Sequence, residues 1–293
     1  MMQVAWVFPG QGSQFVGMGV DLLGSSYAEE KFAQAEEILG WSVWEACQHQ
    51  DERVSRTLYT QPCMYVVESI LADLLRQRGD NPSLVAGHSL GEYVALYVAG
   101  VFDWGSGLRL IQRRSELMDM AAGGMMAALI GFDRDRLLKE IEQTPDVVLA
   151  NDNSSAQVVI SGMPNAVEMV LSQVSAKRAI PLKVSGAFHS PFMASAAAQF
   201  QELLELVQFQ TAQVPVLSNT EPEPATDATI LKARLSRQMT GLVRWRETSL
   251  RLPQEGIEKV IEIGPGKVLT GLIKRTCPEL LLENISSVEE LQS

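Results

Sequence analysis

A serine between two glycines is the feature of this sequence with the clearest chemical meaning. Residues 87–91 (Gly-His-Ser-Leu-Gly) have the pattern G-x-S-x-G, which is typical of a nucleophile elbow, a tight turn from a strand into a helix. Apolar runs over residues 83–86 and 93–99 precede and follow it, as a strand and a helix would. Such a turn presents the hydroxyl of Ser89 beside backbone N–H groups that stabilise negative charge. The alternative is a serine that caps an ordinary helix.

A nucleophilic serine needs a general base, normally a histidine, and the sequence has three histidines. His49 lies in the polar segment 48–52 and is expected to be solvated. His88 directly precedes Ser89, and successive side chains of an extended segment point to opposite faces, so His88 should point away from the hydroxyl. His189 remains as the candidate base, in the order serine then histidine of the α/β-hydrolases. The alternative is a histidine that only satisfies backbone groups nearby.

The group that would orient the imidazole of His189 is not evident. No aspartate occupies an obvious motif position for this role. Either the third member of the site cannot be recognised from the sequence, or a neutral acceptor orients the ring. From the residues alone, the prediction is a serine acyl-transfer site on an α/β core.

An arginine on an apolar helix face is the second candidate for chemistry. Helical spacing over residues 104–121, at about 100° per residue, places Arg114 near the middle of an apolar stripe. Because an unpaired buried charge is very costly, its guanidinium needs a charged partner. That partner is either a carboxylate of this chain, in an internal salt bridge, or a substrate carboxylate bound by two hydrogen bonds. The stripe consists of Leu110, Leu117, Met118 and Ala121.

A glycine-rich loop follows the first apolar run of the chain. Residues 4–8 are expected to form a strand, and residues 9–14 (Pro-Gly-Gln-Gly-Ser-Gln) come directly after it. The loop has neither the G-x-G-x-x-G pattern nor the G-K-[ST] ending of phosphate-binding loops, so nucleotide binding is disfavoured. A turn with free backbone N–H groups is the better interpretation, and such a group could stabilise an oxyanion.

The middle of the chain has the pattern of a small inserted domain. Over residues 124–185 the predicted order of elements is βαββαβ, which is the ferredoxin-like arrangement. Glycines at 123–124 and at 186 bound this segment. The expected strands are 125–130, 147–151, 157–161 and 179–184, and the expected helices are 134–142 and 165–176.

The segments on both sides of this insert alternate between strands and helices. That alternation predicts an α/β fold with a mainly parallel sheet. The predicted domains are a core of residues 1–123 plus 186–293 and the insert of residues 124–185. His189 would lie where the chain returns to the core, and clefts form at such domain boundaries. Further strands are expected at 214–217 and 260–263, and helices at 28–48, 61–75, 190–207, 230–239 and 268–275.

Composition excludes several classes of function. A formal net charge of −11 argues against nucleic acid as a partner. No apolar run approaches about 18 residues, and no basic segment with a long apolar run begins the chain, so neither membrane insertion nor secretion is expected. Three histidines are too few for a metal site built on imidazoles. Three cysteines without metal-ligand spacing favour a reducing, cytoplasmic location; they are Cys47, Cys63 and Cys277.

With these residues assembled, the chain closely resembles the malonyl-CoA:acyl carrier protein transacylases of type II fatty acid synthesis. The resemblance covers nearly the full length, and several motifs in a fixed order are far more specific than the elbow alone. It implies an α/β-hydrolase-like large domain with a mainly parallel sheet and an inserted ferredoxin-like small domain. The motifs lie at residues 9–14, 60–62, 87–93, 114, 151–161, 186–190, 237–238 and 262–267.

The resemblance implies catalytic roles for the matched residues. Ser89 is similar to the acyl-accepting nucleophile of the family, and His189 is similar to its general base. The backbone N–H groups of Gln11 and Leu90 match the oxyanion hole. Arg114 matches the residue that binds the malonyl carboxylate.

Further matches concern orientation and substrate binding. The main-chain carbonyl of Gln238 matches the group that accepts a hydrogen bond from the base, which would replace the missing aspartate. Asn151 and Asn153 match positions near the pantetheine and CoA, and Gln61 belongs to a matched motif that we assign to substrate binding. The form Gly-Ala-Phe-His-Ser at residues 186–190 resembles malonyl-selective members rather than methylmalonyl-selective ones.

The implied reaction is a ping-pong transfer of malonyl from malonyl-CoA to the pantetheine thiol of acyl carrier protein, without a metal or redox cofactor. A serine thioesterase or hydrolase is one alternative, although hydrolysis would waste a carboxylate-binding Arg114. A discrete acyltransferase serving a polyketide synthase is another, and its active site would look the same. A catalytically inactive carrier-binding module is disfavoured by the presence of Ser89 and His189.

An acidic carrier protein would need a local basic surface on this acidic chain. We expect some of the basic residues in the second half of the chain to line the mouth of the cleft and to form ion pairs with the carrier. The alternative is that they are solvated surface charges. The candidates are Lys177, Arg178, Lys183, Lys267, Lys274 and Arg275.

Overall fold

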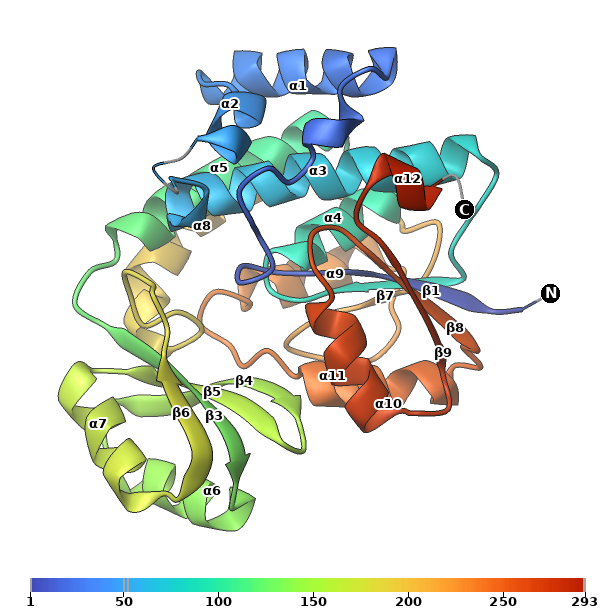
Figure 1. Cartoon of the computed structure of the whole chain (residues 1–293). Helices are drawn as coiled ribbons and strands as arrows, with labels where there is room; N and C mark the ends of the chain where they lie inside the picture. Colours follow the sequence, from blue (N-terminus) through green and yellow to red (C-terminus); the bar gives the residue numbers. More distant parts are fainter. Residues whose placement is uncertain (1, 50, 52, 292–293) are drawn as a thin grey trace.

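Two β-sheets of different kinds organise the chain (Figure 1). The computed structural model describes residues 2–49, 51 and 53–291. One sheet is parallel throughout, in the order β7-β2-β1-β8-β9, and consists of β1 (Val4–Phe8), β2 (Leu84–Gly87), β7 (Val216–Leu217), β8 (Lys259–Ile263) and β9 (Leu281–Ile285). The other is antiparallel, in the order β4-β5-β3-β6, and consists of β3 (Met125–Phe132), β4 (Val147–Ser154), β5 (Gln157–Gly162) and β6 (Ala176–Pro181).

The parallel sheet brings two loops together at one edge. β1 and β2 are neighbours, and Phe8 lies opposite Gly87 in their register. Because the strands run in the same direction, the glycine-rich loop after Phe8 and the G-x-S-x-G turn after Gly87 leave the sheet at the same edge. Ligands of open α/β sheets bind at this carboxyl edge.

Helices cover both faces of the parallel sheet (Figure 1). One face is covered by α3 (Thr57–Gln77), α4 (Gly91–Val98) and α5 (Trp104–Met120), with α1 (Ser26–Leu39), α2 (Val43–Gln48) and the short helices η1 (Val20–Leu22) and η2 (Arg53–Ser55) outside them. The other face is covered by α10 (Trp245–Gln254) and α11 (Val268–Thr276). The last helix is α12 (Val288–Leu291).

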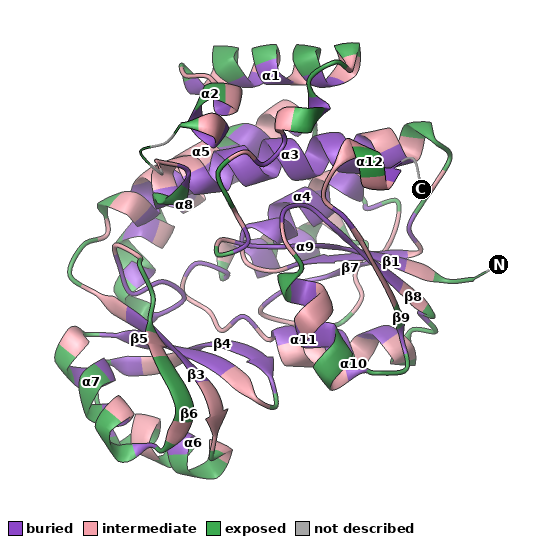
Figure 2. Cartoon of the chain, in the orientation of Figure 1, coloured by how far each residue is buried: buried purple, intermediate pink, exposed green. Residues whose placement is uncertain are grey.

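The central strand β1 shows why helices pack on both faces of the parallel sheet. Its side chains alternate between the two faces, as in any strand. Trp6 and Phe8 pack in the cluster that contains α3, α4 and α5, whereas Ala5 and Val7 pack in the cluster that contains α10 and α11. Figure 2 shows the resulting layers, with the buried strands and α3 between helices that are exposed on their outer sides.

Two of the expected helices differ clearly from the observed ones in the first part of the chain. The helix expected over residues 28–48 is divided, because Gly40 ends α1 in the left-handed conformation with φ 78°, which glycine adopts without steric cost. Pro62 lies inside α3 rather than at its start. Its missing N–H removes one helical hydrogen bond, but most residues around it are buried, and tertiary packing overrides the propensity. The sequence also did not predict α10, β9 and α12.

The antiparallel sheet forms the predicted ferredoxin-like unit. α6 (Arg134–Gln143) follows β3, and α7 (Pro164–Gln173) follows β5, which gives the order βαββαβ. The unit has a separate apolar cluster that includes Leu129, Leu137, Ile160 and Val167. Its last strand, β6, begins three residues before the expected start at residue 179. The predicted fold class, an α/β core with a ferredoxin-like insert, is confirmed.

The two connections between the sheets pass close to each other. A Cβ atom added to Gly124 would lie 2.2 Å from the backbone nitrogen of Ala187, and one added to Gly186 would lie 2.2 Å from the carbonyl oxygen of Ala121. Only glycine permits this approach. The contact supports the division into residues 1–123 plus 186–293 and residues 124–185, which stays a prediction.

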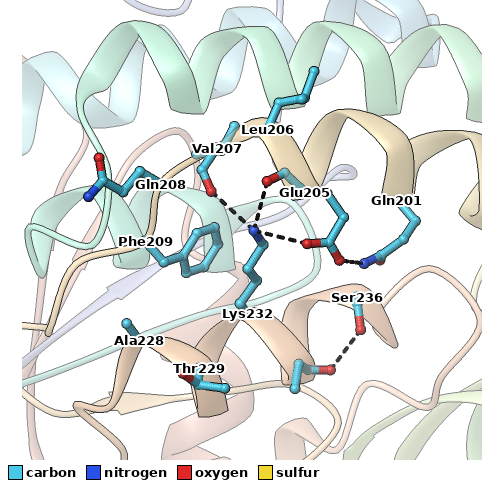
Figure 3. A pocket seen from close by; sticks show the side chains of 11 residues that line it. Gln201, Glu205, Leu206, Val207, Gln208, Phe209, Ala228, Thr229, Lys232 and Ser236 are labelled. Carbon is cyan, nitrogen blue, oxygen red and sulfur yellow. Dashed lines mark hydrogen bonds and ion pairs between the residues drawn. The ribbon is translucent and has the colours of Figure 1, made fainter.

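The chain returns to the core through a helix that is hydrogen-bonded to a neighbouring helix. Ser190 caps the helical segment with its hydroxyl, as expected, but the segment begins as the short helix η3 (Pro191–Met193) before α8 (Ala194–Leu206). Lys232 of α9 (Ala228–Ser236) donates hydrogen bonds to the carbonyl oxygens of Glu205 and Val207 at the end of α8 (Figure 3). No helix in the described part of the chain is both long and apolar enough to span a membrane.

Candidate active site

A cleft lies between the carboxyl edge of the parallel sheet and the antiparallel sheet. Its volume is about 320 Å³, and its lining includes Gln11, Ser89 and His189 on one side and Asn151 and Asn153 on the other. A larger hollow of about 670 Å³ lies between α8 and α9, but none of the candidate residues lines it (Figure 3). The chemistry is therefore in the smaller cleft.

The elbow at Ser89 has the geometry that its pattern predicts. Ser89 has φ 53°, which is unusual for a residue other than glycine. A Cβ atom added to Gly87 would lie 1.9 Å from the carbonyl carbon of Gly91, and one added to Gly91 would lie 2.1 Å from the carbonyl oxygen of Phe8. Both glycines are required because the backbone segments touch there. The hydroxyl of Ser89 consequently faces the cleft.

His189 is placed to act on the serine hydroxyl. Its Nε2 lies 2.8 Å from Oγ of Ser89, and its Nδ1 lies 2.9 Å from the carbonyl oxygen of Gln238. Since a carbonyl can only accept, Nδ1 carries the proton and Nε2 is free to accept one from the serine. Of the options left by the sequence, the neutral acceptor is the one observed. Burial, followed by the positive charge of Arg114, lowers the pKa of His189 to about 3.

Arg114 is fully buried and its charge faces the serine. Its Nη1 donates to Oε1 of Gln61 at 2.8 Å, and its Nη2 donates to Oγ of Ser89 at 3.0 Å and to Oε1 of Gln238 at 3.1 Å. The ring of Tyr93 lies 5.4 Å from its guanidinium carbon. The internal salt bridge considered as one alternative is not present in the described part of the chain. Neutral oxygens hold the cation, and burial lowers its pKa.

A buried carboxylate that the sequence did not indicate orients the amide of Gln238. Nε2 of Gln238 donates to Oε2 of Glu92 at 2.7 Å and to the carbonyl oxygen of Ser89 at 2.8 Å. These two acceptors force the amide oxygen of Gln238 to face Arg114. Burial raises the pKa of Glu92. The available signal was a glutamate directly between the elbow and the apolar run that follows it.

Asn219 is a second residue that the sequence did not single out. Its Oδ1 accepts from the backbone N–H of Ser89 at 2.6 Å, and its Nδ2 donates to the carbonyl oxygen of Gly87 at 2.5 Å. The side chain therefore fixes the turn that carries the nucleophile. Only its place directly after an expected strand pointed to a loop at the sheet edge.

Two backbone N–H groups remain free beside the serine. Those of Gln11 and Leu90 have no hydrogen-bond acceptor among residues 2–49, 51 and 53–291. They belong to the loop after β1 and to the elbow after β2, which leave the sheet side by side. Free donors at such a position can stabilise an oxyanion.

The remaining candidates lie at different depths. Gln61 is a buried residue of the cleft lining, and its Nε2 donates to the sulfur of Met118 at 3.3 Å. Oδ1 of Asn153 accepts a hydrogen bond from Nε2 of His88 at 2.8 Å. His88 therefore contacts Asn153 rather than Ser89, as the strand argument expects. His49 is exposed and pairs with Asp51 at 2.9 Å.

No group of three or more histidine, cysteine, aspartate or glutamate side chains in the described part of the chain is placed to hold a metal ion. The three cysteines are free and buried. The chemistry available in the cleft is that of a serine nucleophile, a neutral imidazole, free backbone donors and a buried guanidinium. This combination suits the transfer of an acyl group that carries a negative charge.

Comparisons with known proteins agree with this chemistry. The family model of the acyl transferase domain matches residues 5–292. The malonyl CoA-acyl carrier protein transacylase of Synechocystis sp. is 58% identical over 292 residues, which is 100% of both chains, and its crystal structure superposes with a TM-score of 0.98 over 99% of each chain. A malonyl-transacylase in complex with a type II polyketide acyl-carrier protein is 36% identical, with a TM-score of 0.93 over 99% of this chain and 98% of that one. The chain therefore belongs to the acyl transferase family, among the malonyl-CoA:acyl carrier protein transacylases.

Proposed function

We propose that this enzyme transfers the malonyl group of malonyl-CoA to the pantetheine thiol of acyl carrier protein, and so supplies extender units for fatty acid synthesis. The transfer proceeds through a malonyl ester of Ser89. The observation that carries the proposal is the position of Arg114, which donates to Oγ of Ser89 at 3.0 Å and has no carboxylate partner in the described part of the chain. A buried cation beside the nucleophile favours an acyl group with its own carboxylate.

In the first half-reaction, Nε2 of His189 accepts the proton of Ser89 as Oγ attacks the thioester carbonyl. The oxyanion is stabilised by the backbone N–H groups of Gln11 and Leu90, and one such donor contributes about 2.7–4 kcal/mol to lowering the barrier. The tetrahedral intermediate collapses, the carbon–sulfur bond breaks, and the CoA thiolate takes the proton from His189. Nδ1 donates to the carbonyl of Gln238 throughout, so Nε2 is the nitrogen that gains and then loses the proton.

The second half-reaction reverses these steps with a different thiol. The pantetheine thiol of the carrier gives its proton to His189 and attacks the malonyl ester, and Ser89 leaves as the hydroxyl. Arg114 binds the malonyl carboxylate in both halves, and Gln61 and Gln238 hold its guanidinium ready for that contact. We infer that neither a metal nor a redox cofactor takes part. His189 accounts for each proton transfer, and the backbone donors and Arg114 account for the negative charges of the oxyanion and the malonyl carboxylate.

The pantetheine arm is assigned to the opposite wall of the cleft. Asn151 and Asn153 line that wall, and their amides can bond to the amides of the arm. Lys183 and Lys267 are exposed and adjoin residues that line the cleft, so we assign the docking of an acidic carrier to them first. The free, buried cysteines fit the cytoplasmic location that we propose.

The proposal is tested by incubating the protein with malonyl-CoA and, separately, with acetyl-CoA. Mass spectrometry should find a malonyl adduct on Ser89 and much less acetyl adduct, and the Ser89→Ala variant should carry neither. Equal labelling by the two donors would contradict the role of Arg114. Rapid release of free malonate without carrier would favour a hydrolase.

A second function is favoured by the comparison with the malonyl-transacylase bound to a polyketide carrier. The two pathways share the chemistry and differ in the carrier. Transfer rates to fatty acid and polyketide carriers, measured side by side, distinguish them. A higher kcat/KM for the polyketide carrier would replace the fatty acid assignment and leave the mechanism unchanged.

A further inference from the structure

Asp152 lies between the two asparagines of the cleft wall but faces away from the cleft. Asn151 and Asn153 line the cleft, and the intervening side chain of β4 points to the opposite face of the sheet. The carboxylate of Asp152 is only 6% exposed. A carboxylate buried to this extent needs charged or hydrogen-bonded partners, and it has both.

Two arginines from different parts of the molecule bind this carboxylate. Arg134, at the start of α6, donates from Nη2 to Oδ1 at 2.7 Å and from Nη1 to Oδ2 at 3.1 Å. Arg246, in α10, donates from Nε to Oδ2 at 3.0 Å. Arg134 belongs to the same ferredoxin-like unit as Asp152, so that pair is internal to the unit. The pair between Asp152 and Arg246 instead joins the unit to the core.

Backbone hydrogen bonds cross the same boundary beside this pair. The N–H of Asp152 donates to the carbonyl of Val243 at 2.9 Å, and the N–H of Val243 donates to the carbonyl of Ala150 at 2.9 Å. Val243 lies five residues after Gln238, whose carbonyl orients His189. The segment that holds the base therefore also holds the strand that carries the two asparagines.

We propose that Asp152 is a positioning residue, whose ion pair with Arg246 holds β4 at a fixed distance from the catalytic core and so sets Asn151 and Asn153 for the pantetheine arm. The proposal rests on the proposed function, because it assigns that wall to pantetheine. The physical basis is that a charge-assisted hydrogen bond to a carboxylate shielded from water is strong and directional. Both thioester substrates carry the same arm, so both depend on this distance.

The matched experiment compares Arg246→Gln with Arg134→Gln. Each variant removes one arginine from Asp152, but only the first removes an ion pair between the unit and the core. We expect Arg246→Gln to raise the KM for malonyl-CoA and for carrier by about tenfold, with kcat changed by less than about twofold. Arg134→Gln should leave both KM values within about twofold of wild type, because the ion pair that it breaks lies within the unit. Acylation of Ser89 by 4-nitrophenyl acetate, which has no pantetheine arm, should proceed at the wild-type rate in both variants.

Two further measurements separate positioning from stability. The Asp152→Asn and Arg246→Gln changes should be non-additive in KM when combined, because they break one link. In native-state hydrogen exchange, the amides of Asp152 and Val243 should exchange faster in Arg246→Gln than in Arg134→Gln at equal melting temperature.

The proposal is overturned if Arg246→Gln leaves KM unchanged, or if both variants raise KM equally in proportion to their loss of melting temperature. Failure of the proposed function has a different signature, since the wild-type protein would then form no malonyl adduct on Ser89. The exchange measurement needs no substrate. It would still show whether the ion pair holds β4 against the core.

Discussion

Arg114 donates a hydrogen bond to the hydroxyl of Ser89 at 3.0 Å from a position that solvent does not reach. The same nitrogen, Nη2, also donates to the amide oxygen of Gln238, and Nη1 donates to the amide oxygen of Gln61. A fixed cation beside the nucleophile binds a carboxylate without reorganising, which is the condition for effective electrostatic stabilisation. The acyl group that fits this site has a carboxylate within reach of its thioester carbonyl.

The first prediction concerns donor choice. Replacing Arg114 with alanine should lower kcat/KM for malonyl-CoA by about two to three orders of magnitude, because a charge-assisted, two-point contact to the carboxylate is lost. Relative activity on acetyl-CoA should rise. The control is Arg113→Ala, since Arg113 is half-exposed and pairs with Glu116. An unchanged ratio of malonyl to acetyl transfer in Arg114→Ala would refute the assignment of the carboxylate-binding role.

The second prediction concerns pH. Burial and the charge of Arg114 lower the pKa of His189 from 6.5 to about 3, so the imidazole remains neutral and able to accept a proton well below pH 6. We expect kcat/KM for acylation of Ser89 to show no acidic limb near 6.5. A limb at that value in the wild-type profile would show that the base is solvated.

The lowered pKa of His189 also affects the stability of the folded chain. Because the folded-state pKa of His189 lies below its unfolded value, the unfolded chain binds the proton more readily between pH 6.5 and 3. This contribution opposes folding increasingly as pH falls through that window and is absent above it. Urea unfolding at pH 7 and pH 5 should show a smaller pH dependence in His189→Asn than in wild type. An equal pH dependence in the two proteins would contradict the shift.

The third prediction concerns the elbow glycines. A methyl group at Gly91 would lie 2.1 Å from the carbonyl oxygen of Phe8, so Gly91→Ala should displace the elbow and abolish labelling of Ser89. Gly271 is the matched control, because no heavy atom other than those of its chain neighbours and its own helix backbone lies within 4 Å of a Cβ built there. In the helix interior, Gly271→Ala should stabilise the protein by about 0.5–1 kcal/mol. Retained labelling in Gly91→Ala would show that the backbone can open at this contact.

The fourth prediction concerns the carrier. Charge reversal at Lys267, which is exposed and adjoins cleft-lining Val268, should raise the KM for carrier several-fold and weaken its salt dependence. The KM for malonyl-CoA should change little. Lys139→Glu on the outer helix α6 reverses another exposed charge, away from the cleft, and should change neither value. Equal effects of the two reversals would indicate net charge rather than docking.

The sequence alone determined those parts of the site that a local backbone pattern encodes. The strand at residues 4–8 was predicted with its observed bounds, because a short buried strand is a continuous apolar run. The elbow was recognisable because only glycine fits at positions 87 and 91, where backbone segments touch. The βαββαβ order of the insert followed from periodicity within each element.

The partners of each catalytic side chain were decided by the tertiary structure. Residue spacing predicted two partners for Arg114 equally, a carboxylate of this chain or a carboxylate of the substrate. In the fold, the amide oxygens of Gln61 and Gln238 reach its guanidinium from distant elements instead of an internal carboxylate. The orientation of His189 by a main-chain carbonyl was implied only by family resemblance, because every residue has such a carbonyl and the sequence contains no sign of its use.

Residues that act through a second residue were not identified from the sequence, for the same reason. Glu92 and Asn219 hold Gln238 and the elbow, and Asp152 receives an arginine from α10, a helix that was not predicted. Their roles depend on which side chains face each other across elements that packing brings together. Periodicity and spacing determine which face of an element is buried, whereas the identity of the opposing residue exists only in the folded chain.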